Sequence, residues 1–584
     1  MYSLEKRRRG QKINKIAIIS GLGLGVMIFP EIARSQTPTW LTQRIDDPVE
    51  ERFIQPQPLP DFIPDDDEPS LQSPPESQPL PNPEVENVTF PITDVEIIGN
   101  TALTGADLAA IVQPLEGREV SLAQLQGAAN EITQLYVSQG YVTSRAIVPE
   151  QEITDGVVQI EIIEGRISEV RVEGNQNVRE SYIRSRVQLG THTPVRVREI
   201  EDQLRLLQTS DLFNRIDASL QPGTELGESV LVLQVSENSA WGLQGRFDNY
   251  SPPAVGSEIL GVTGIQRSLT GWGDRVTLAY DRTTTGGYEV YEGRYQLPVN
   301  PMNGTLQLRV VASNNEIPLN QGIKVRGNSE RYEVSFRQPL IRSPREEFAV
   351  SLGFAYQEGQ TFLGDFPFGF GIGPSADGES RTSVFRLGQD YRRRDIMGSW
   401  GLRSLFSIGT GLFDATNNES PIPDSQFFSW LGQVQRVQRL SPNQLLLIQG
   451  AIQLTPDALL SSEQFVIGGG QSLRGYRQNA KAGDNGWRFS VEDRITVVRD
   501  RDRRSILQVA PFFDAGAVWN HPDNPNNAGR SGPNFLAGIG TGILWTPLPN
   551  LRLRLDYGLP LIEVQQGDRN LQDEGFYFSL QYQL

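Results

Sequence analysis

FYFSLQYQL, at residues 576–584, places an apolar side chain at every second position. The same period of two occurs in LRLRLDY at 551–557 and in LQLRV at 306–310. Successive side chains of a β-strand point to opposite faces, so each segment predicts a strand with one apolar and one polar face. A transmembrane β-barrel needs this pattern, because one face meets lipid and the other lines a polar lumen.

The alternative is a soluble β-sandwich, whose polar faces would meet water. The candidate strands run for about ten residues, which is long for a sandwich and usual for a barrel. Arginine and aspartate recur on the polar face, and the last segment keeps its apolar residues on one side. Bacterial barrels have an even number of strands. We therefore predict a membrane β-barrel of about sixteen antiparallel strands over 239–584.

The N-terminal region has the plan of a secretory signal peptide. Residues 1–15 are rich in lysine and arginine, an apolar run follows at 16–29, and Ala33-Arg34-Ser35 forms a cleavage site. The apolar run has about 14 residues, fewer than the roughly 20 that a helix needs to cross a bilayer. We therefore expect 1–35 to be a cleaved signal peptide and not a membrane anchor.

Residues 36–89 are rich in proline and acidic side chains. Such a segment cannot bury enough apolar surface to fold alone, so it predicts an extended linker. Its first part, TWLTQRIDDPVEERF at 39–53, could form a short amphipathic helix.

Two units between the linker and the barrel, at 90–165 and 166–238, repeat the order strand, helix, helix, strand, strand. Each opens with a strand that ends in Gly-Asn, at 99–100 and 174–175. The expected strands are 92–98, 143–148, 157–163, 167–172, 215–220 and 229–235, and the expected helices are 104–112, one beginning at Ser121, 179–187 and 197–208. A repeat of roughly 70–75 residues predicts two copies of one α+β domain rather than two unrelated ones.

The composition opposes several classes of function. The formal net charge of −17 argues against a nucleic-acid partner, because binding to phosphates needs basic patches. The chain has no cysteine and only two histidines, His192 and His521, which argues against thiolate or histidine metal sites and a histidine-based triad. Because no set of nucleophile, base and oxyanion donors is found, we expect a protein that is not an enzyme and has no cofactor.

A long segment between two candidate strands contains GGGQSLRGYRQNAKAGDNGW at 468–487, centred on Leu473-Arg474-Gly475-Tyr476. Phe512-Phe513-Asp514 follows on the next candidate strand but one. A loop inside a polar lumen needs polar contacts with the wall, and an arginine fork can bind a carboxylate through two hydrogen bonds. Gly475 permits a tight turn, and Tyr476 supplies an aromatic ring with a polar end. The alternative is an ordinary surface loop.

The two repeats, the LRGY tetrad and the FFD segment together resemble the superfamily of barrels preceded by POTRA domains. QLYVSQGYVTSRAIVPEQEITDGVVQIEIIEG, at 134–165, resembles the POTRA type of two-partner secretion transporters, the haemolysin secretion/activation proteins of the ShlB/FhaC/HecB type. In that superfamily the arginine of the tetrad lies at the tip of a loop inside the barrel and pairs with the aspartate of an F-x-D motif. The resemblance implies these roles for five residues, Arg474, Gly475, Tyr476, Phe512 and Asp514.

The resemblance also implies a function. Two periplasmic POTRA domains would bind an unfolded exoprotein, and a barrel in outer-membrane lipid would pass it through the pore. A substrate strand can add to an exposed sheet edge. The candidate edge residues are Arg145, Ala146, Ile147, Val148, Arg215, Ile216 and Asp217.

The main rival to secretion is an outer-membrane assembly factor that inserts other barrel proteins. Two POTRA domains, rather than three or five, and the proline-rich linker favour secretion of a haemagglutinin- or haemolysin-like exoprotein. A passive porin would have no use for POTRA domains, and an outer-membrane phospholipase or protease would need a catalytic site. Segment 576–584 resembles the signal read by the barrel assembly machinery, with Leu584 where phenylalanine is more usual.

Overall fold

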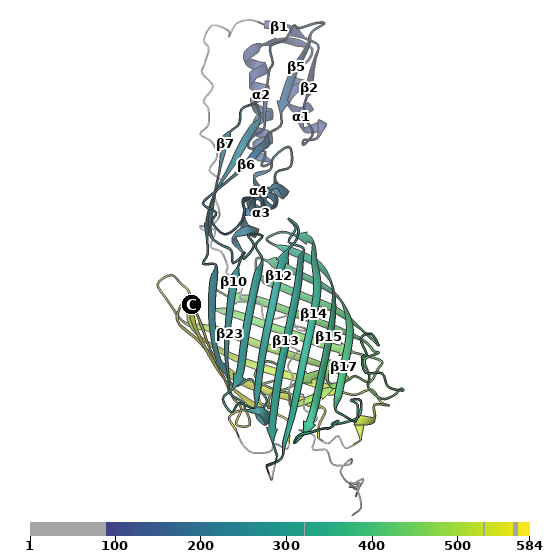
Figure 1. Ribbon diagram of the computed structural model, residues 1–584. Helices are drawn as coiled ribbons and strands as arrows, with labels where there is room; N and C mark the ends of the chain where they lie inside the picture. Colours follow the sequence, from purple (N-terminus) through teal and green to yellow (C-terminus); the bar gives the residue numbers. More distant parts are fainter. Residues whose placement is uncertain (1–88, 320–321, 529–531, 565–569) are drawn as a thin grey trace, which may run out of the picture.

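The computed structural model describes residues 89–319, 322–528, 532–564 and 570–584. Two small units form an elongated front end, and a large barrel follows them (Figure 1). The expected signal peptide at 1–35 and the helix proposed within 39–53 lie outside the described residues. None of the described helices is long and apolar enough to cross a membrane.

The first unit is an α+β fold with two strands more than predicted, because the expected strand at 92–98 is divided into two and a further strand lies between the helices. Its elements are β1 Thr89–Ile92, β2 Asp94–Ile98, α1 Gly105–Val112, β3 Arg118–Ser121, α2 Leu122–Ser138, β4 Arg145–Ile147 and β5 Val157–Ile163. The main sheet has the order β2-β5-β4, with β2 parallel and β4 antiparallel to β5. Ser121 caps α2 through a capping box with Gln124.

The expected single strand at 92–98 was wrong, because the chain forms two strands here. Thr93 separates them, and its backbone N–H donates to the carbonyl of Gly156. β1 pairs with β3 in a separate two-stranded sheet. β3 has only four residues, REVS, and its partner is distant in sequence, so its pattern could not reveal it.

The second unit repeats the arrangement of the two α-helices and the main sheet. It contains β6 Arg166–Glu173, α3 Glu180–Val187, α4 Val197–Gln208, β7 Phe213–Pro222 and β8 Glu228–Glu237. The sheet order is β6-β8-β7, again with one parallel and one antiparallel pair. In each unit the helices and the sheet enclose a separate apolar core.

The turn after the first strand of each unit's main sheet has the same hydrogen-bond scheme. The glycines are left-handed, with φ of +83° at Gly99 and +86° at Gly174. A Cβ at these positions would lie 2.2 Å from the Ile162 carbonyl oxygen and 2.3 Å from that of Val235, each on the neighbouring strand. Glu164 and Glu237 each accept hydrogen bonds from backbone N–H groups of the turn. Burial raises the pKa of Glu237, but hydrogen bonds from three backbone N–H groups outweigh it and lower that pKa.

The described part of the remaining chain forms a closed antiparallel barrel of sixteen strands, which confirms the predicted architecture. The strands are β9 Trp241–Asp248, β10 Ile259–Arg267, β11 Arg275–Thr283, β12 Tyr288–Pro298, β13 Thr305–Pro318, β14 Lys324–Arg342, β15 Glu346–Leu363, β17 Glu379–Asp395, β18 Gly398–Thr410, β19 Phe428–Ser441, β20 Gln444–Leu454, β23 Asn485–Arg499, β24 Ser505–Trp519, β25 Phe535–Leu548, β26 Leu551–Pro560 and β27 Phe576–Gln583. β27 pairs with β9 and closes the barrel. A short strand, β16 Phe366–Pro367, pairs with the end of β15.

The two faces of the barrel wall differ in chemistry as the alternation predicts. On β13, Leu308 is exposed on the outer face, while the adjacent Arg309 is buried. On β14, Val334 is exposed, while Arg331 is buried. Apolar side chains therefore cover the outside, and the inside carries charges, as a barrel in lipid requires.

The second unit contacts the end of the barrel where β9 begins. The Asp211 carboxylate accepts a hydrogen bond from Arg267 Nε at 2.8 Å and forms an ion pair with Arg275. The Arg179 backbone N–H donates to the Gly271 carbonyl, and its guanidinium lies 4.9 Å from the centre of the Trp272 ring. Charge and hydrogen bonds therefore hold the front end to the turn between β10 and β11.

Protonation of Asp211 weakens this junction. Burial raises the pKa of Asp211, but Arg275 and Arg267 outweigh that effect and hold the pKa below its ordinary value of 3.8. A lowered pKa means that contact favours the charged form, so the stabilisation is present above about pH 4 and is lost as the pH falls through the lowered pKa.

We predict that Asp211→Asn broadens the distance distribution between the second unit and the barrel at neutral pH. Spin labels on cysteines introduced at the exposed positions Gln221 and Arg501 would measure it, since the chain has no cysteine of its own. Asp217→Asn is the matched control, because that carboxylate pairs with Arg215 within the second unit. An unchanged distribution in Asp211→Asn would contradict the prediction.

Candidate functional site

The chain between β20 and β23 folds back into the barrel, and we call residues 455–484 the pore loop. It contains the short paired strands β21 Phe465–Ile467 and β22 Lys481–Gly483. Leu473 and Tyr476, at the tip, are fully buried and belong to a cluster that includes Leu431 and Leu536 of the barrel wall. An apolar contact surface therefore exists inside the otherwise polar lumen.

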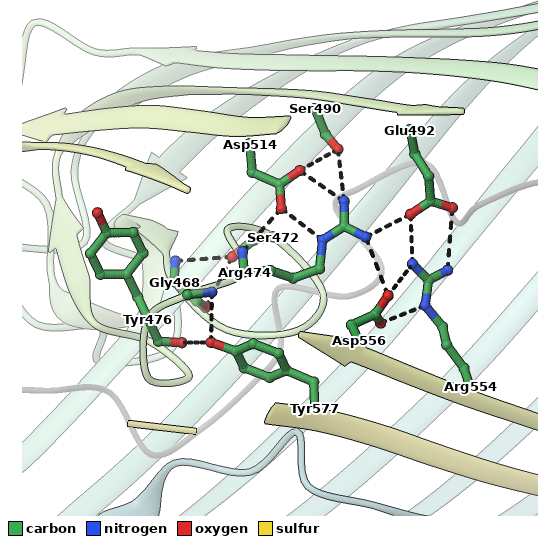
Figure 2. A network of polar contacts seen from close by, with 11 residues as sticks. Gly468, Ser472, Arg474, Tyr476, Ser490, Glu492, Asp514, Arg554, Asp556 and Tyr577 are labelled. Atoms are coloured by element: carbon green, nitrogen blue, oxygen red, sulfur yellow. Dashed lines mark hydrogen bonds and ion pairs between the residues drawn. The ribbon is translucent and has the colours of Figure 1, made fainter. Parts of the chain in front are cut away.

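Arg474 makes the central contact of the tip with the wall (Figure 2). Its Nε donates to Asp514 Oδ2 at 2.7 Å, and its Nη2 donates to Asp514 Oδ1 at 2.9 Å. The backbone N–H of Arg474 donates to the same carboxylate at 3.0 Å. The guanidinium lies 3.4 Å from the centre of the Phe512 ring, which gives it a cation–π contact. The predicted pair of Arg474 and Asp514 is therefore formed, and two hydrogen bonds join the guanidinium to this carboxylate of β24.

Further charges surround this pair. Glu492 accepts from Arg474 Nη1 at 2.6 Å and from Arg554 at 2.6 Å, and Asp556 pairs with Arg554 at 2.6 Å (Figure 2). Arg494 also contacts Glu492 at 2.6 Å. Among the described residues, these contacts join three arginines to three carboxylates, counting Arg474 and Asp514. Balanced pairing is what allows charges to be buried, because an uncompensated buried charge is strongly destabilising.

At two positions where the backbone of the tip meets the wall, the wall has glycine. A Cβ at Gly538 would lie 2.1 Å from the Arg474 carbonyl oxygen, and one at Gly558 would lie 2.7 Å from the Gly475 nitrogen. Gly475 itself has a φ of +99°, a conformation that residues with a side chain rarely adopt. Glycines on both sides therefore let the two backbones approach closely.

Two tyrosines complete the contact of the tip. Tyr577 OH accepts from the Gly475 N–H at 2.9 Å and donates to the Tyr476 carbonyl at 2.7 Å. Tyr476 OH donates to the Ala537 carbonyl at 2.7 Å. The structure thus brings together all five residues expected at this site, and places Phe512 and Asp514 on the inner face and Phe513 on the outer face.

Sequence reasoning missed Glu492, Arg554, Asp556 and the wall glycines. Alternation along β23 and β26 places the three charged side chains inside the lumen, which was a usable signal. It does not reveal their distance from Arg474, because that depends on the stagger of strands around the barrel. The glycines carried no signal of a loop contact.

The predicted substrate-binding residues lie on β4 and β7, which are outermost in their described sheets. β7 contains Arg215, Ile216 and Asp217 within a strand of ten residues. β4 has only three residues and excludes Val148. The backbone N–H of Ala146 on β4 already donates to Thr133 Oγ1 of α2, so β7 is the more open edge.

Comparison with known proteins agrees with this architecture. A family model described as haemolysin secretion/activation protein ShlB/FhaC/HecB matches residues 227–544, and a model of the ShlB-type POTRA domain matches 90–165. The heme/hemopexin transporter protein HuxB of Haemophilus influenzae strain 86-028NP is 24% identical, over 82% of this chain and 84% of the relative. The outer membrane transporter CdiB of Escherichia coli is 24% identical, over 82% and 81%.

The solved structure of CdiB from Escherichia coli matches with a TM-score of 0.66 and 20% sequence identity. The match covers 87% of this chain and 92% of that one. At this identity the match is evidence for the fold alone.

We predict that Arg474→Ala weakens the loop–wall contact by about 3–5 kcal/mol, since it leaves buried carboxylates without their partner. Arg474→Lys should recover only part of this, because an ammonium group cannot bridge two carboxylates as a planar fork does. The temperature at which the folded barrel band converts to the unfolded band in gel electrophoresis would measure the effect. Arg393→Ala, at an exposed arginine of β17, is the control. A conversion temperature unchanged by Arg474→Ala would refute the prediction.

Proposed function

The chain belongs to the haemolysin secretion/activation protein family of the ShlB/FhaC/HecB type, and from this membership we propose that it carries one large haemolysin- or haemagglutinin-like exoprotein through the outer membrane. The observation that carries the proposal is a polar lumen occupied by a loop of the same chain. Charged and hydrogen-bonded contacts hold that loop to the wall, and such contacts can be exchanged for contacts with a passing polypeptide.

We place the two front units, as POTRA domains, in the periplasm. The second unit contacts the end of the barrel at which the connections are short, for example at 396–397, 442–443 and 549–550. In outer-membrane barrels the short turns face the periplasm and the long loops face outward. The unfolded exoprotein would meet the POTRA domains first.

Capture would use strand addition to β7. An extended peptide that pairs with a sheet edge is held through its backbone, so its side-chain sequence matters little. Arg215, Ile216 and Asp217 lie in the first half of this ten-residue edge. The β4 edge would contribute less, because it is short and its Ala146 N–H is already bonded.

Passage requires the pore loop to leave at least part of its contact with the wall. The wall behind it is lined by charged side chains that can bind the backbone and side chains of an extended chain. Folding of the exoprotein outside the cell would supply the driving force, and the chain has no motif for nucleotide binding.

The test compares secreted and outer-membrane proteins of cells with and without the gene, and of cells complemented with the unaltered chain. We expect one large exoprotein to disappear from the medium or cell surface while other barrel proteins keep their abundance. A broad fall in outer-membrane barrel proteins would overturn secretion in favour of the assembly-factor alternative.

A further inference from the structure

The pore loop carries a second buried charge that is separate from Arg474. Glu463 is 1% exposed, and both oxygens of its carboxylate accept from Arg386 Nη2, at 3.0 and 3.1 Å. Its backbone carbonyl accepts from Gln453 Nε2 at 3.0 Å, which fixes the position of the residue. Arg386 belongs to β17, four strands along the barrel from β23, which carries Glu492. The loop therefore contacts two different sectors of the wall.

Arg386 lies at the end of a row of inward-facing charges that β12, β13, β14 and β17 contribute. Glu333 of β14 contacts Arg386 at 3.5 Å, Arg331 at 2.5 Å and Arg309 at 3.3 Å. Arg309 contacts Glu292 at 2.9 Å, and Arg294 contacts the same glutamate at 2.6 Å. Each arginine of the row thus contacts a glutamate, and Arg309, Arg331 and Arg386 share Glu333.

The row on the wall is short of negative charge without the loop. Among the described residues joined by these contacts, the wall contributes four arginines and two glutamates. Glu463 supplies a third carboxylate, and it binds Arg386, one of the three arginines that share Glu333. If the loop withdraws, the guanidinium of Arg386 on β17 loses a carboxylate partner.

We propose that Glu463 occupies a guanidinium site of the pore wall, holds the loop there in the closed state, and yields the site to acidic side chains of the exported polypeptide when the loop moves. The inference rests on the proposed secretion function and adds the chemistry of one contact between pore and substrate. A glutamate or aspartate of the substrate presents the same carboxylate that Glu463 presents. Arginine binds carboxylates strongly where water is scarce, and such conditions hold at this buried position.

The first experiment records ion currents through purified full-length protein in planar bilayers. Removal of one partner of a buried ion pair favours the state in which the loop has left, so Glu463→Gln should raise the open fraction by about tenfold. Arg386→Gln removes the same contact from the other side, so adding it to Glu463→Gln should raise the open fraction little further. An open fraction unaltered by Glu463→Gln, or effects of the two changes that simply multiply, would overturn the proposal.

The matched control is Glu347→Gln, which breaks an ion pair with Arg337 between two neighbouring strands of the wall. It should leave the open fraction unchanged. Conversion of the folded band on heating, measured for every variant, checks that each barrel has folded.

The second experiment tests the substrate part with a synthetic peptide of alternating glutamate and glycine, added to the Glu463→Gln pore from the side of the POTRA domains. The acidic peptide should block the current at about tenfold lower concentration than its lysine counterpart, and the added change Arg386→Gln should abolish this preference. Equal block by both peptides would overturn the assignment of the site to carboxylates. Because these readouts need no exoprotein, their failure is distinct from a failure of secretion in cells.

Discussion

Arg474 is 5% exposed, yet it carries a full charge, and the carboxylates of Asp514, Glu492 and Asp556 lie within 3.6 Å of it. A charge can stay in such a place only when its partners are fixed in position. The surrounding structure meets that demand with rigid barrel strands, with an aromatic ring beneath the guanidinium, and with glycines that bring the two backbones together. The position of the tip of the pore loop follows from this one contact.

The same constraint links the closed pore to transport. The lumen is lined by charges whose partners are in part supplied by the pore loop, so the loop fills space and also completes the electrostatics of the wall. A loop held only by apolar packing would leave an apolar surface behind, to which an unfolded polypeptide would adhere. A loop held by ion pairs leaves groups that bind a passing chain through contacts that can exchange.

Much of the architecture was predictable, because it depends on local periodicity. Alternation in segments such as 551–557 identified the barrel, and the Gly-Asn turns identified the repeat. At the site, the LRGY tetrad and Asp514 were predictable from chemistry and resemblance. The partnership of Arg474 with Glu492 and the near approach of Gly558 were not, because both depend on how strands far apart in sequence are staggered. β3 could not be predicted for the same reason, since only its pairing with β1 makes it a strand.

The glycines of the inner wall also bear on what happens after the pore loop has moved. Gly538, Gly540 and Gly542 of β25 and Gly558 of β26 lie at inward positions, and all four would clash if they carried a Cβ. Without the tip, Gly538 and Gly558 form a short strip of bare backbone, while Gly540 and Gly542 stay beside Phe512 and Asp556 of the wall. A polypeptide sliding along this strip meets few steric barriers, whatever its own side chains are. The absence of Cβ atoms at these glycines thus lowers both the friction on the polypeptide and the dependence of its passage on sequence.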